Sequence, residues 1–363
     1  MRLLPEVGTP EAKTLIGEYI SCKNNIDIEK LAQKYHYKNS ESFIAGMRGR
    51  LNTKKPSFYH SFTSNTEIPE KPLIINLPKV ELKEYKPIDT GKGDPEEQVL
   101  VISDWHGGKI TPSFNDSVFT KRVNILTERV MLIANLHRHM YPISKLRIID
   151  LGDGEQGENP YQGSKIGDTS MGARDQIAKL VLPAQINQIL SLKQQYEEIE
   201  FDGFPGNHGR YGKEAPETSN WDIFRYDCLK ATIGDVTGIK INIHTDFGGI
   251  INIEGFKFFC FHGDEIKVSN GIPLFALTRR IDKWYQQFNG FDYAICGHFH
   301  KYLNDEISSK VELFMNGTLV SDDPWALKTI GISSVPSQWT FGVHKRSGVT
   351  WRYPLFVDKP IRV

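Results

Sequence analysis

Aspartate, asparagine and histidine residues recur in this chain directly after short apolar runs. Five such segments follow one another in the order Asp-x-His, Gly-Asp, Gly-Asn-His, a single His and Gly-His-x-His. Carboxylate, amide and imidazole donors without thiolates suit manganese, iron or zinc better than a cysteine-rich structural zinc site. Two metals that share one carboxylate can activate water for attack on phosphorus. The candidate side chains are Asp104, His106, Asp153, Asn207, His208, His262, His298 and His300.

The apolar runs before these segments predict the strands that would position them. Short runs rich in valine, isoleucine and phenylalanine, with few charges inside, are typical of buried strands. Glycines beside the polar residues let the backbone turn sharply and approach a metal closely. Because the ends of neighbouring strands meet along one rim of a sheet, we expect the five segments to converge there. The runs are residues 99–103, 146–151, 199–204, 256–261 and 293–296.

Each motif has an ordinary explanation when it stands alone, as a surface turn or as a histidine packed in a core. Five motifs in this order, each after an apolar run, favour one shared site instead. The series resembles the calcineurin-like metallophosphoesterase superfamily over roughly residues 97–320. A turn at Asn316-Gly317-Thr318 is also similar to the one that follows the last motif in that family.

The resemblance implies an α/β fold, a four-layer β-sandwich of two mixed sheets flanked by helices, with the site at its top. It implies two divalent metals, for which manganese is the favoured identity and iron, zinc, nickel and magnesium are alternatives. Asp153 would bridge the metals, and His208 would act as general acid towards the leaving oxygen while a bridging hydroxide attacks the phosphorus. One metal would be held by Asp104, His106 and His300, and the other by Asn207, His262 and His298.

Two departures from the family pattern narrow the substrate. The family often has an acidic residue directly after Gly-Asn-His, whereas this chain has Gly209-Arg210, so another group must orient the catalytic histidine. Arg210 could contact a substrate phosphate or could be a solvated surface residue. Protein phosphatases of the family carry Asp-Arg-Gly shortly after Gly-Asp, and this chain has no such arginine there, which argues against a protein phosphatase.

The long stretch from Gly154 to Arg174 follows the predicted bridging aspartate. Irregular loops of this length in compact domains are often functional, so Lys165 and Arg174 are candidate substrate contacts; a plain surface loop is the alternative. Tyr211, Lys213 and Trp221 could stack on nucleobases or could simply pack. We predict helices over residues 174–196 and 273–288, and closing strands over residues 311–315, 340–343 and 349–356.

The chain of 363 residues is long enough for a catalytic domain and one smaller module. Lysine plus arginine and aspartate plus glutamate both number 44, so net charge gives no sign of nucleic-acid binding. No apolar stretch approaches the ~20 residues needed to cross a bilayer, and no leader-like segment follows Met1, so a cytoplasmic location without membrane contact is expected. The four scattered cysteines predict reduced, buried thiols.

Residues 1–52 predict a module of three short helices that loosely resembles a helix-turn-helix. Residues 1–60 hold ten basic and six acidic side chains, an excess of four positive charges that favours phosphate contact. Ser40, Arg48 and Arg50 are the candidate DNA contacts. A helical bundle for dimerisation or for docking on the catalytic domain is the alternative. Residues 53–96, rich in proline and lysine, predict a connector, and residues 97–363 the catalytic domain.

Three functional hypotheses follow. The first is a metal-dependent nuclease that hydrolyses phosphodiester bonds in DNA, similar to the nucleases of double-strand-break repair and their phage-encoded relatives, with a repair or recombination protein or a second copy as possible partner. The second is a phosphomonoesterase or cyclic-nucleotide phosphodiesterase acting on a small molecule. The third, an inactive scaffold, is disfavoured because all eight site residues are present. The missing phosphatase arginine and the N-terminal module favour the first.

Overall fold

The structure, a computed structural model, describes residues 9–22, 25–37, 42–45, 47, 91–158, 166–212, 218–267, 273–324 and 335–358. It divides the chain into two compact units, Met1–Ile74 and Ile75–Val363. The greater part of the expected connector, residues 53–90, lies outside the described residues.

The smaller unit contains α1 (Pro10–Ile20) and α2 (Asn25–Lys34), and residues 42–45 and 47 are also helical. Thr9 caps α1 by accepting a hydrogen bond from the Ala12 amide at 3.2 Å, and Pro10 stands at the first helical position, where no amide hydrogen is needed. Apolar side chains from the three helical stretches form a small core, in which Phe43 contacts the rings of Tyr19 and Tyr35.

In the larger unit, the first sheet has six strands, four of them parallel. Long helices connect the parallel strands: α4 (Asp116–Arg138) follows β1, α6 (Leu182–Lys193) follows β2 and α7 (Trp221–Ile233) follows β3. Parallel neighbours require such crossovers, and the helices cover one face of the sheet. In spatial order the strands are β11 (Gly348–Phe356), β10 (Ser337–His344), β1 (Glu96–Ile102), β2 (Lys145–Asp150), β3 (Glu198–Gly203) and β4 (Ile239–Ile243).

The second sheet has five strands, with β6, β7 and β9 parallel and an antiparallel strand at each edge. Helix α8 (Pro273–Gln287) connects β6 to β7 and packs its apolar face on the sheet through Leu277, Ile281 and Trp284. In spatial order the strands are β5 (Gly248–Ile253), β6 (Phe256–Phe261), β7 (Tyr293–Cys296), β9 (Val311–Met315) and β8 (Leu303–Ser308).

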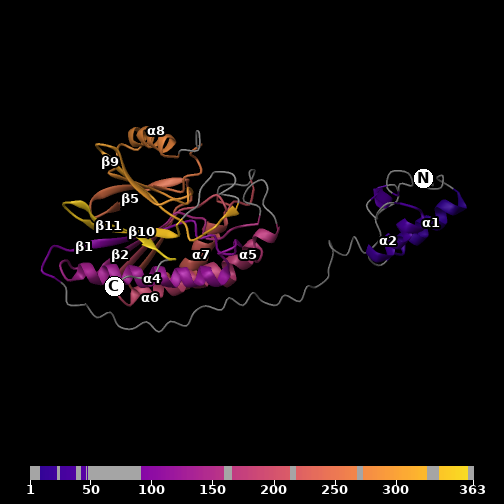
Figure 1. Ribbon diagram of the computed structural model, residues 1–363, viewed down its shortest axis with the longest axis horizontal. Coiled ribbons are helices and arrows are strands. Elements are labelled where there is room, and N and C mark those ends of the chain that lie inside the picture. Colours follow the sequence, from indigo (N-terminus) through magenta and orange to yellow (C-terminus); the bar gives the residue numbers. More distant parts are fainter. Residues whose placement is uncertain are drawn as a thin grey trace. The chain divides into compact units, whose positions relative to one another are not determined.

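Three apolar cores separate four layers (Figure 1). The largest lies between the first sheet and α4, α6 and α7, the second between the two sheets, and the third between the second sheet and α8. Both faces of strand β1 are buried, because Leu100 and Ile102 face the helices and Val99 and Val101 face the other sheet. This is the predicted fold class, a β-sandwich of two mixed sheets with helices outside.

The helix predicted over residues 174–196 is interrupted. Helix α5 (Ala173–Gln176) runs into a π-helical turn, Ile177–Val181, before α6 begins. Pro183 stands at the start of α6 and has no amide hydrogen to donate, so the backbone just before it adopts a wider hydrogen-bonding pattern.

A cluster of charged side chains lies across neighbouring strands of the first sheet. The Arg147 guanidinium pairs with Glu97 at 3.0 Å, Glu200 at 2.9 Å and Asp202 at 3.0 Å. The Asp202 carboxylate also contacts His244 at 3.0 Å and accepts a hydrogen bond from Asn242. These residues join β1, β2, β3 and the end of β4.

Among the residues that the structure describes, no helix is both long and apolar enough to cross a membrane.

Candidate metal centre

The five motifs follow the carboxyl ends of parallel strands in both sheets. Asp104 follows β1, Asp153 follows β2, Asn207 follows β3, His262 follows β6 and His298 follows β7. Hydrogen bonds join the loops: the Asp104 amide donates to the Gly152 carbonyl, and the Gly297 amide donates to the His262 carbonyl. The predicted convergence at one rim is therefore what the structure contains.

Five residues of the motifs have a left-handed backbone, with φ between +47° and +67°. This conformation costs about 1–2 kcal/mol for a residue with a β-carbon and is concentrated at functional sites. All five lie in the loops that follow β1, β2 and β7. The residues are Asp104, His106, Asp153, His298 and His300.

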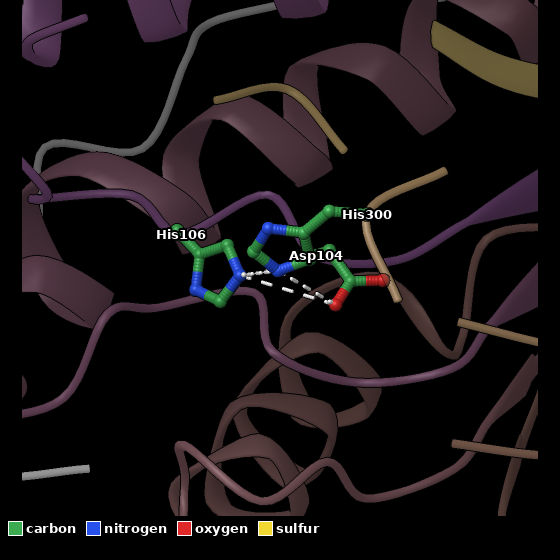
Figure 2. A group of neighbouring side chains, drawn as sticks. All are labelled: Asp104, His106 and His300. Carbon is green, nitrogen blue, oxygen red and sulfur yellow. Dashed lines mark hydrogen bonds and ion pairs between the residues drawn. The ribbon is translucent and has the colours of Figure 1, made fainter. Parts of the chain in front are cut away.

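Asp104, His106 and His300 form one compact group (Figure 2). The His106 Nε2 and His300 Nε2 atoms are 2.9 Å apart, and the Asp104 Oδ1 atom lies 3.4 Å from His300 Nε2 and 3.9 Å from His106 Nε2. Two imidazole nitrogens and a carboxylate oxygen thus face a common point. Two neutral imidazoles can share a single proton there, whereas a cation would accept all three lone pairs.

His262 is at the centre of a second group, with Asp153 and Asn207. Its Nδ1 atom lies 2.7 Å from the Leu151 carbonyl oxygen and therefore carries a proton that it donates. Its Nε2 atom lies 3.0 Å from Asn207 Oδ1 and 3.2 Å from Asp153 Oδ2, both of which are acceptors. A neutral His262 would place a lone pair against two others, so this corner also suits a cation.

His298 borders the second group. Its ring centroid is 5.2 Å from that of His262, and its backbone amide donates to both carboxylate oxygens of Asp104, at 3.1 and 3.0 Å. Asp104, His106, Asp153, His262 and His300 thus lie in overlapping groups, with Asn207 and His298 against His262, and Asp153 lies next to both groups. Their role as ligands remains a prediction.

The protonation states at this rim suit metal binding. Burial lowers the pKa of His106 well below its usual value, and burial together with nearby His262 lowers the pKa of His298 to about 4. Burial would raise the pKa of Asp153, but His262 and His208 hold that pKa well below its usual value. His262 is the exception, because Asp153 outweighs burial and raises its pKa. These shifts favour neutral His106 and His298 beside an ionised Asp153, the forms that bind metals.

Two glycines leave room for the carboxylates. A β-carbon on Gly206 would lie 2.1 Å from Asp153 Oδ1, and one on Gly297 would lie 2.6 Å from Asp104 Oδ2. Any larger residue at either position would displace a candidate ligand.

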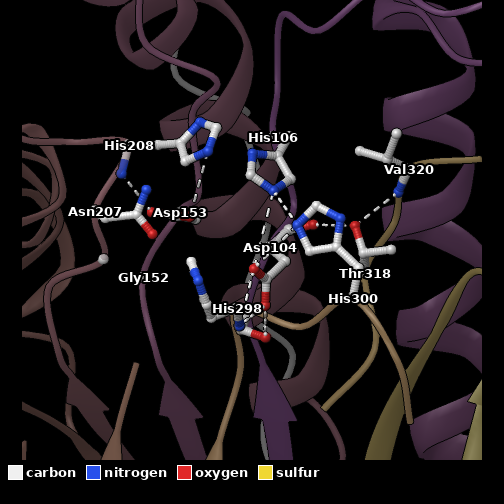
Figure 3. Close-up of polar contacts among 12 residues, drawn as sticks. Asp104, His106, Gly152, Asp153, Asn207, His208, His298, His300, Thr318 and Val320 are labelled. Carbon is white, nitrogen blue, oxygen red and sulfur yellow. Dashed lines mark hydrogen bonds and ion pairs between the residues drawn. The ribbon is translucent and has the colours of Figure 1, made fainter. Parts of the chain in front are cut away.

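His208 lies beside the candidate ligands His106 and Asp153, with its ring centroid 4.5 Å from that of His106, and contacts of its own fix its position (Figure 3). Its backbone amide donates to Asp153 Oδ1 at 2.8 Å, and its Nδ1 atom lies 2.8 Å from the Gln156 carbonyl oxygen. The Nε2 atom is 3.9 Å from Asp153 Oδ2. The Gln156 carbonyl thus orients the ring in place of the acidic residue that is missing after His208. Burial lowers the pKa of His208.

Helix α7 supports the loops that carry Asp153 and Asn207. This helix was not predicted from the sequence. The Asp222 carboxylate accepts hydrogen bonds from the amides of Asp153 at 2.9 Å, Gly154 at 3.2 Å and Gly206 at 3.0 Å. Fully buried Arg225 pairs with Asp222 at 2.7 Å and with Asp150 at 2.9 Å. The signal was present in Asn220, which caps α7 by accepting a hydrogen bond from the Asp222 amide.

Polar side chains support Asp104 from its other side. The Ser103 hydroxyl donates to Asp104 Oδ2 at 2.5 Å and accepts from the Asn316 amide at 2.9 Å. The Thr318 hydroxyl donates to the Asp104 carbonyl oxygen at 2.7 Å. The turn at residues 316–318, which is similar to one in the family, therefore supports Asp104 and the serine before it.

The candidate substrate contacts have different surroundings. Arg210 is half-exposed and pairs with Asp264 at 2.5 Å, so it joins the loops that carry His208 and His262. Arg174 is exposed on α5. Lys165 and the candidate DNA contacts Ser40, Arg48 and Arg50 lie outside the described residues.

Comparisons with known proteins place these features in context. No protein-family model matches the sequence, and no curated protein matches it. Among solved structures, a zinc complex of Vps29 from Entamoeba histolytica aligns with 71% of this chain and 99% of its own at 12% identity, with a TM-score of 0.34. An archaeal phosphodiesterase aligns with 71% of this chain and 99% of its own at 13% identity, with a TM-score of 0.33. A 5′-nucleotidase from Candida albicans SC5314 aligns with 75% of this chain and 52% of its own, at 13% identity and a TM-score of 0.33.

The chain itself carries the likeness to a known family. Five motifs occur in a specific order, two mixed sheets place them at one rim, and their side chains meet in compact groups of oxygen and imidazole donors. This combination is similar to the motif order and the two-sheet fold of the calcineurin-like metallophosphoesterase superfamily.

Proposed function

We propose that this protein is a two-metal phosphodiesterase that acts on DNA. The observation that carries the proposal is the meeting of carboxylate, amide and imidazole lone pairs at one rim, beside a histidine held by separate contacts. Such a donor set needs cations to neutralise it, and the adjacent histidine offers a proton. Together they supply what hydrolysis of a phosphate ester requires.

Two groups of residues would hold the ions. Asp104, His106 and His300 are the first set, Asn207, His262 and His298 the second, and Asp153 lies between them. When bound, divalent ions would supply Lewis acidity to a phosphoryl oxygen and a source of hydroxide near neutral pH. Manganese is our choice among the ions that this donor set accepts.

His208 would serve as general acid. Its Nδ1 atom donates to the Gln156 carbonyl, which fixes the ring, so Nε2, 3.9 Å from Asp153 Oδ2, is the atom that would carry the transferable proton. Its lowered pKa makes the protonated ring a stronger acid towards a departing alkoxide. Since neither Nδ1 nor the backbone amide needs to move, the proton can be delivered without rearrangement of the loop.

Positive charge in residues 1–60 and at the rim favours DNA as the substrate. The excess of four positive charges in residues 1–60 favours contact with phosphates. At the rim, the guanidinium of Arg210 is half-exposed beside the loop of His208, where it could contact a phosphate next to the one that is cleaved.

The test is turnover by the purified full-length chain supplied with Mn²⁺. Labelled single-stranded and double-stranded DNA would be compared with a chromogenic phosphodiester and a chromogenic phosphomonoester. Cleavage of either DNA above the rate on the monoester supports the proposal. Turnover of the monoester or of a cyclic nucleotide, with both DNA substrates left intact, would instead favour the small-molecule alternative.

A further inference from the structure

Three aromatic rings form a partly exposed patch beside the loop of His208. Tyr211 stacks on Trp221, with ring centroids 4.6 Å apart and an angle of 28° between the planes. Phe224, one turn further along α7, meets Trp221 edge to face at 5.8 Å. The outer rings are open to solvent, with 56% of Tyr211 and 46% of Phe224 exposed.

The patch is tied to the candidate metal centre through the backbone. The Trp221 amide donates to the Gly209 carbonyl at 2.8 Å, and Arg210 and Asn220 form an isolated β-bridge. Asp222, the residue after Trp221, accepts a hydrogen bond from the amide of Asp153. Asp222 therefore supports the Asp153 loop, while the preceding residue, Trp221, belongs to the aromatic patch.

The chemistry of the patch fits a flat, partly polar ring. Trp221 packs partly against the core and supports Tyr211 from behind, so the free face of Tyr211 belongs to a rigid stack. Tyr211 and Phe224 both pack on Trp221 and leave apolar surface exposed, which a bound ring could cover. Half-exposed Arg210, the residue before Tyr211, pairs with Asp264 through Nη1 and could also contact a phosphate attached to such a ring.

We propose that Tyr211, Trp221 and Phe224 form a platform on which an unpaired nucleobase stacks next to the scissile phosphodiester. The inference rests on the proposed function and adds a substrate class to it. Because a base in the middle of a duplex has both faces covered, the platform selects single strands, frayed ends or gaps. Stacking on aromatic rings tolerates any base, so little dependence on sequence is expected.

The experiment uses the full-length protein with Mn²⁺ and two single strands of equal length. One is an oligothymidylate, and the other has the same backbone with abasic sites next to the cleaved bond. The measured quantity is the ratio of kcat/KM for the two strands. The variants are Tyr211→Ala, Tyr211→Phe, which keeps the ring, and Phe275→Ala, which removes an aromatic residue that is 60% exposed on α8.

In the wild-type protein the strand with bases should be preferred. Tyr211→Ala should lower that preference roughly fivefold or more, the lower end of the effect per stacked base. Tyr211→Phe and Phe275→Ala should leave the ratio unchanged. The platform proposal would be refuted if the kcat/KM ratio were equal in wild type and Tyr211→Ala, or near one in wild type. Neither result would contradict the proposed phosphodiesterase activity.

Binding gives a second readout that does not depend on turnover. Fluorescence anisotropy of the same labelled strands on metal-free protein should show weaker binding of the thymidylate strand to Tyr211→Ala and no change for the abasic strand. If wild type cleaves neither strand, the proposed function fails. The platform is then judged by anisotropy alone, and equal affinities of wild type and Tyr211→Ala for thymidylate would refute it.

Discussion

Single side chains at the rim have separable tasks, because the atoms that would bind metal are not the atoms that position His208. Asp153 uses Oδ2 towards His262 and Oδ1 towards the backbone of His208. The His208 ring is oriented by the Gln156 carbonyl, which accepts from Nδ1. Substitutions can therefore remove the acid while leaving the candidate ligands in place.

We expect His208→Ala to lower turnover of a phosphodiester by about 10²–10⁴-fold, the usual effect of a general acid. Metal content, measured by inductively coupled plasma mass spectrometry, should stay at the wild-type value. His139→Ala, at an exposed position after α4, is the control and should keep full activity. Wild-type turnover by His208→Ala would remove this residue from the mechanism.

Asp153→Asn should deplete both metals, because it removes the negative charge between the two groups of candidate ligands. The same mass spectrometry gives the stoichiometry, and Asp282→Asn on the exposed face of α8 controls for the loss of a carboxylate. Retention of two ions per chain by Asp153→Asn would show that Asp153 does not bridge them.

At the scale of elements, the sequence predicted the strands that end at motifs and their common rim. Apolar runs such as residues 256–261 are recognisable because both faces of the strand are buried. The sequence did not reveal α4 or α7, although both cover the first sheet and Asp222 of α7 supports the Asp153 loop. Support of this kind depends on long-range contacts between a helix start and a distant loop, which local patterns do not encode.

The charged cluster around Arg147 gives a prediction about pH. Burial would raise the pKa of Asp202, but His244 and Arg147 outweigh burial and lower it. The ionised form is therefore favoured in the folded state. Its stabilisation is present above the unfolded pKa of about 3.9 and is lost as the pH falls through the lower, folded pKa.

Accordingly, Asp202→Asn should lower the free energy of unfolding by about 1–3 kcal/mol at pH 7, and the difference from wild type should shrink below pH 4. Chemical denaturation at several pH values measures this difference. Asp227→Asn, at an exposed position on α7, should be close to wild type throughout. A difference that stays constant down to pH 3 would mean that ionisation of Asp202 contributes nothing.

At the scale of the whole molecule, two units have different characters. The larger contains the candidate metal centre, and the smaller has a compact core of its own around Phe43. The sequence predicted the first two helices of the smaller unit, but the proposed DNA contacts lie at residues that the structure does not describe.

If Arg48 and Arg50 contact phosphates, replacing both with alanine should weaken DNA binding by the full-length chain irrespective of sequence. The slope of log affinity against log salt concentration should also fall by roughly two units. Fluorescence anisotropy over a range of salt concentrations measures both quantities. Arg279→Ala with Arg280→Ala removes the same charge from α8 as a control. An unchanged slope after loss of Arg48 and Arg50 would favour a protein-binding role for this unit.

The split origin of the candidate ligands has a consequence for how the sandwich holds together. Asp104, Asp153 and Asn207 extend from one sheet, whereas His262, His298 and His300 extend from the other. Ions at the rim would act as cross-links between the two halves of the domain, in addition to the apolar side chains between them. A chelator would then remove the cross-links between the sheets as well as any metal-dependent activity. The domain would therefore melt at a lower temperature.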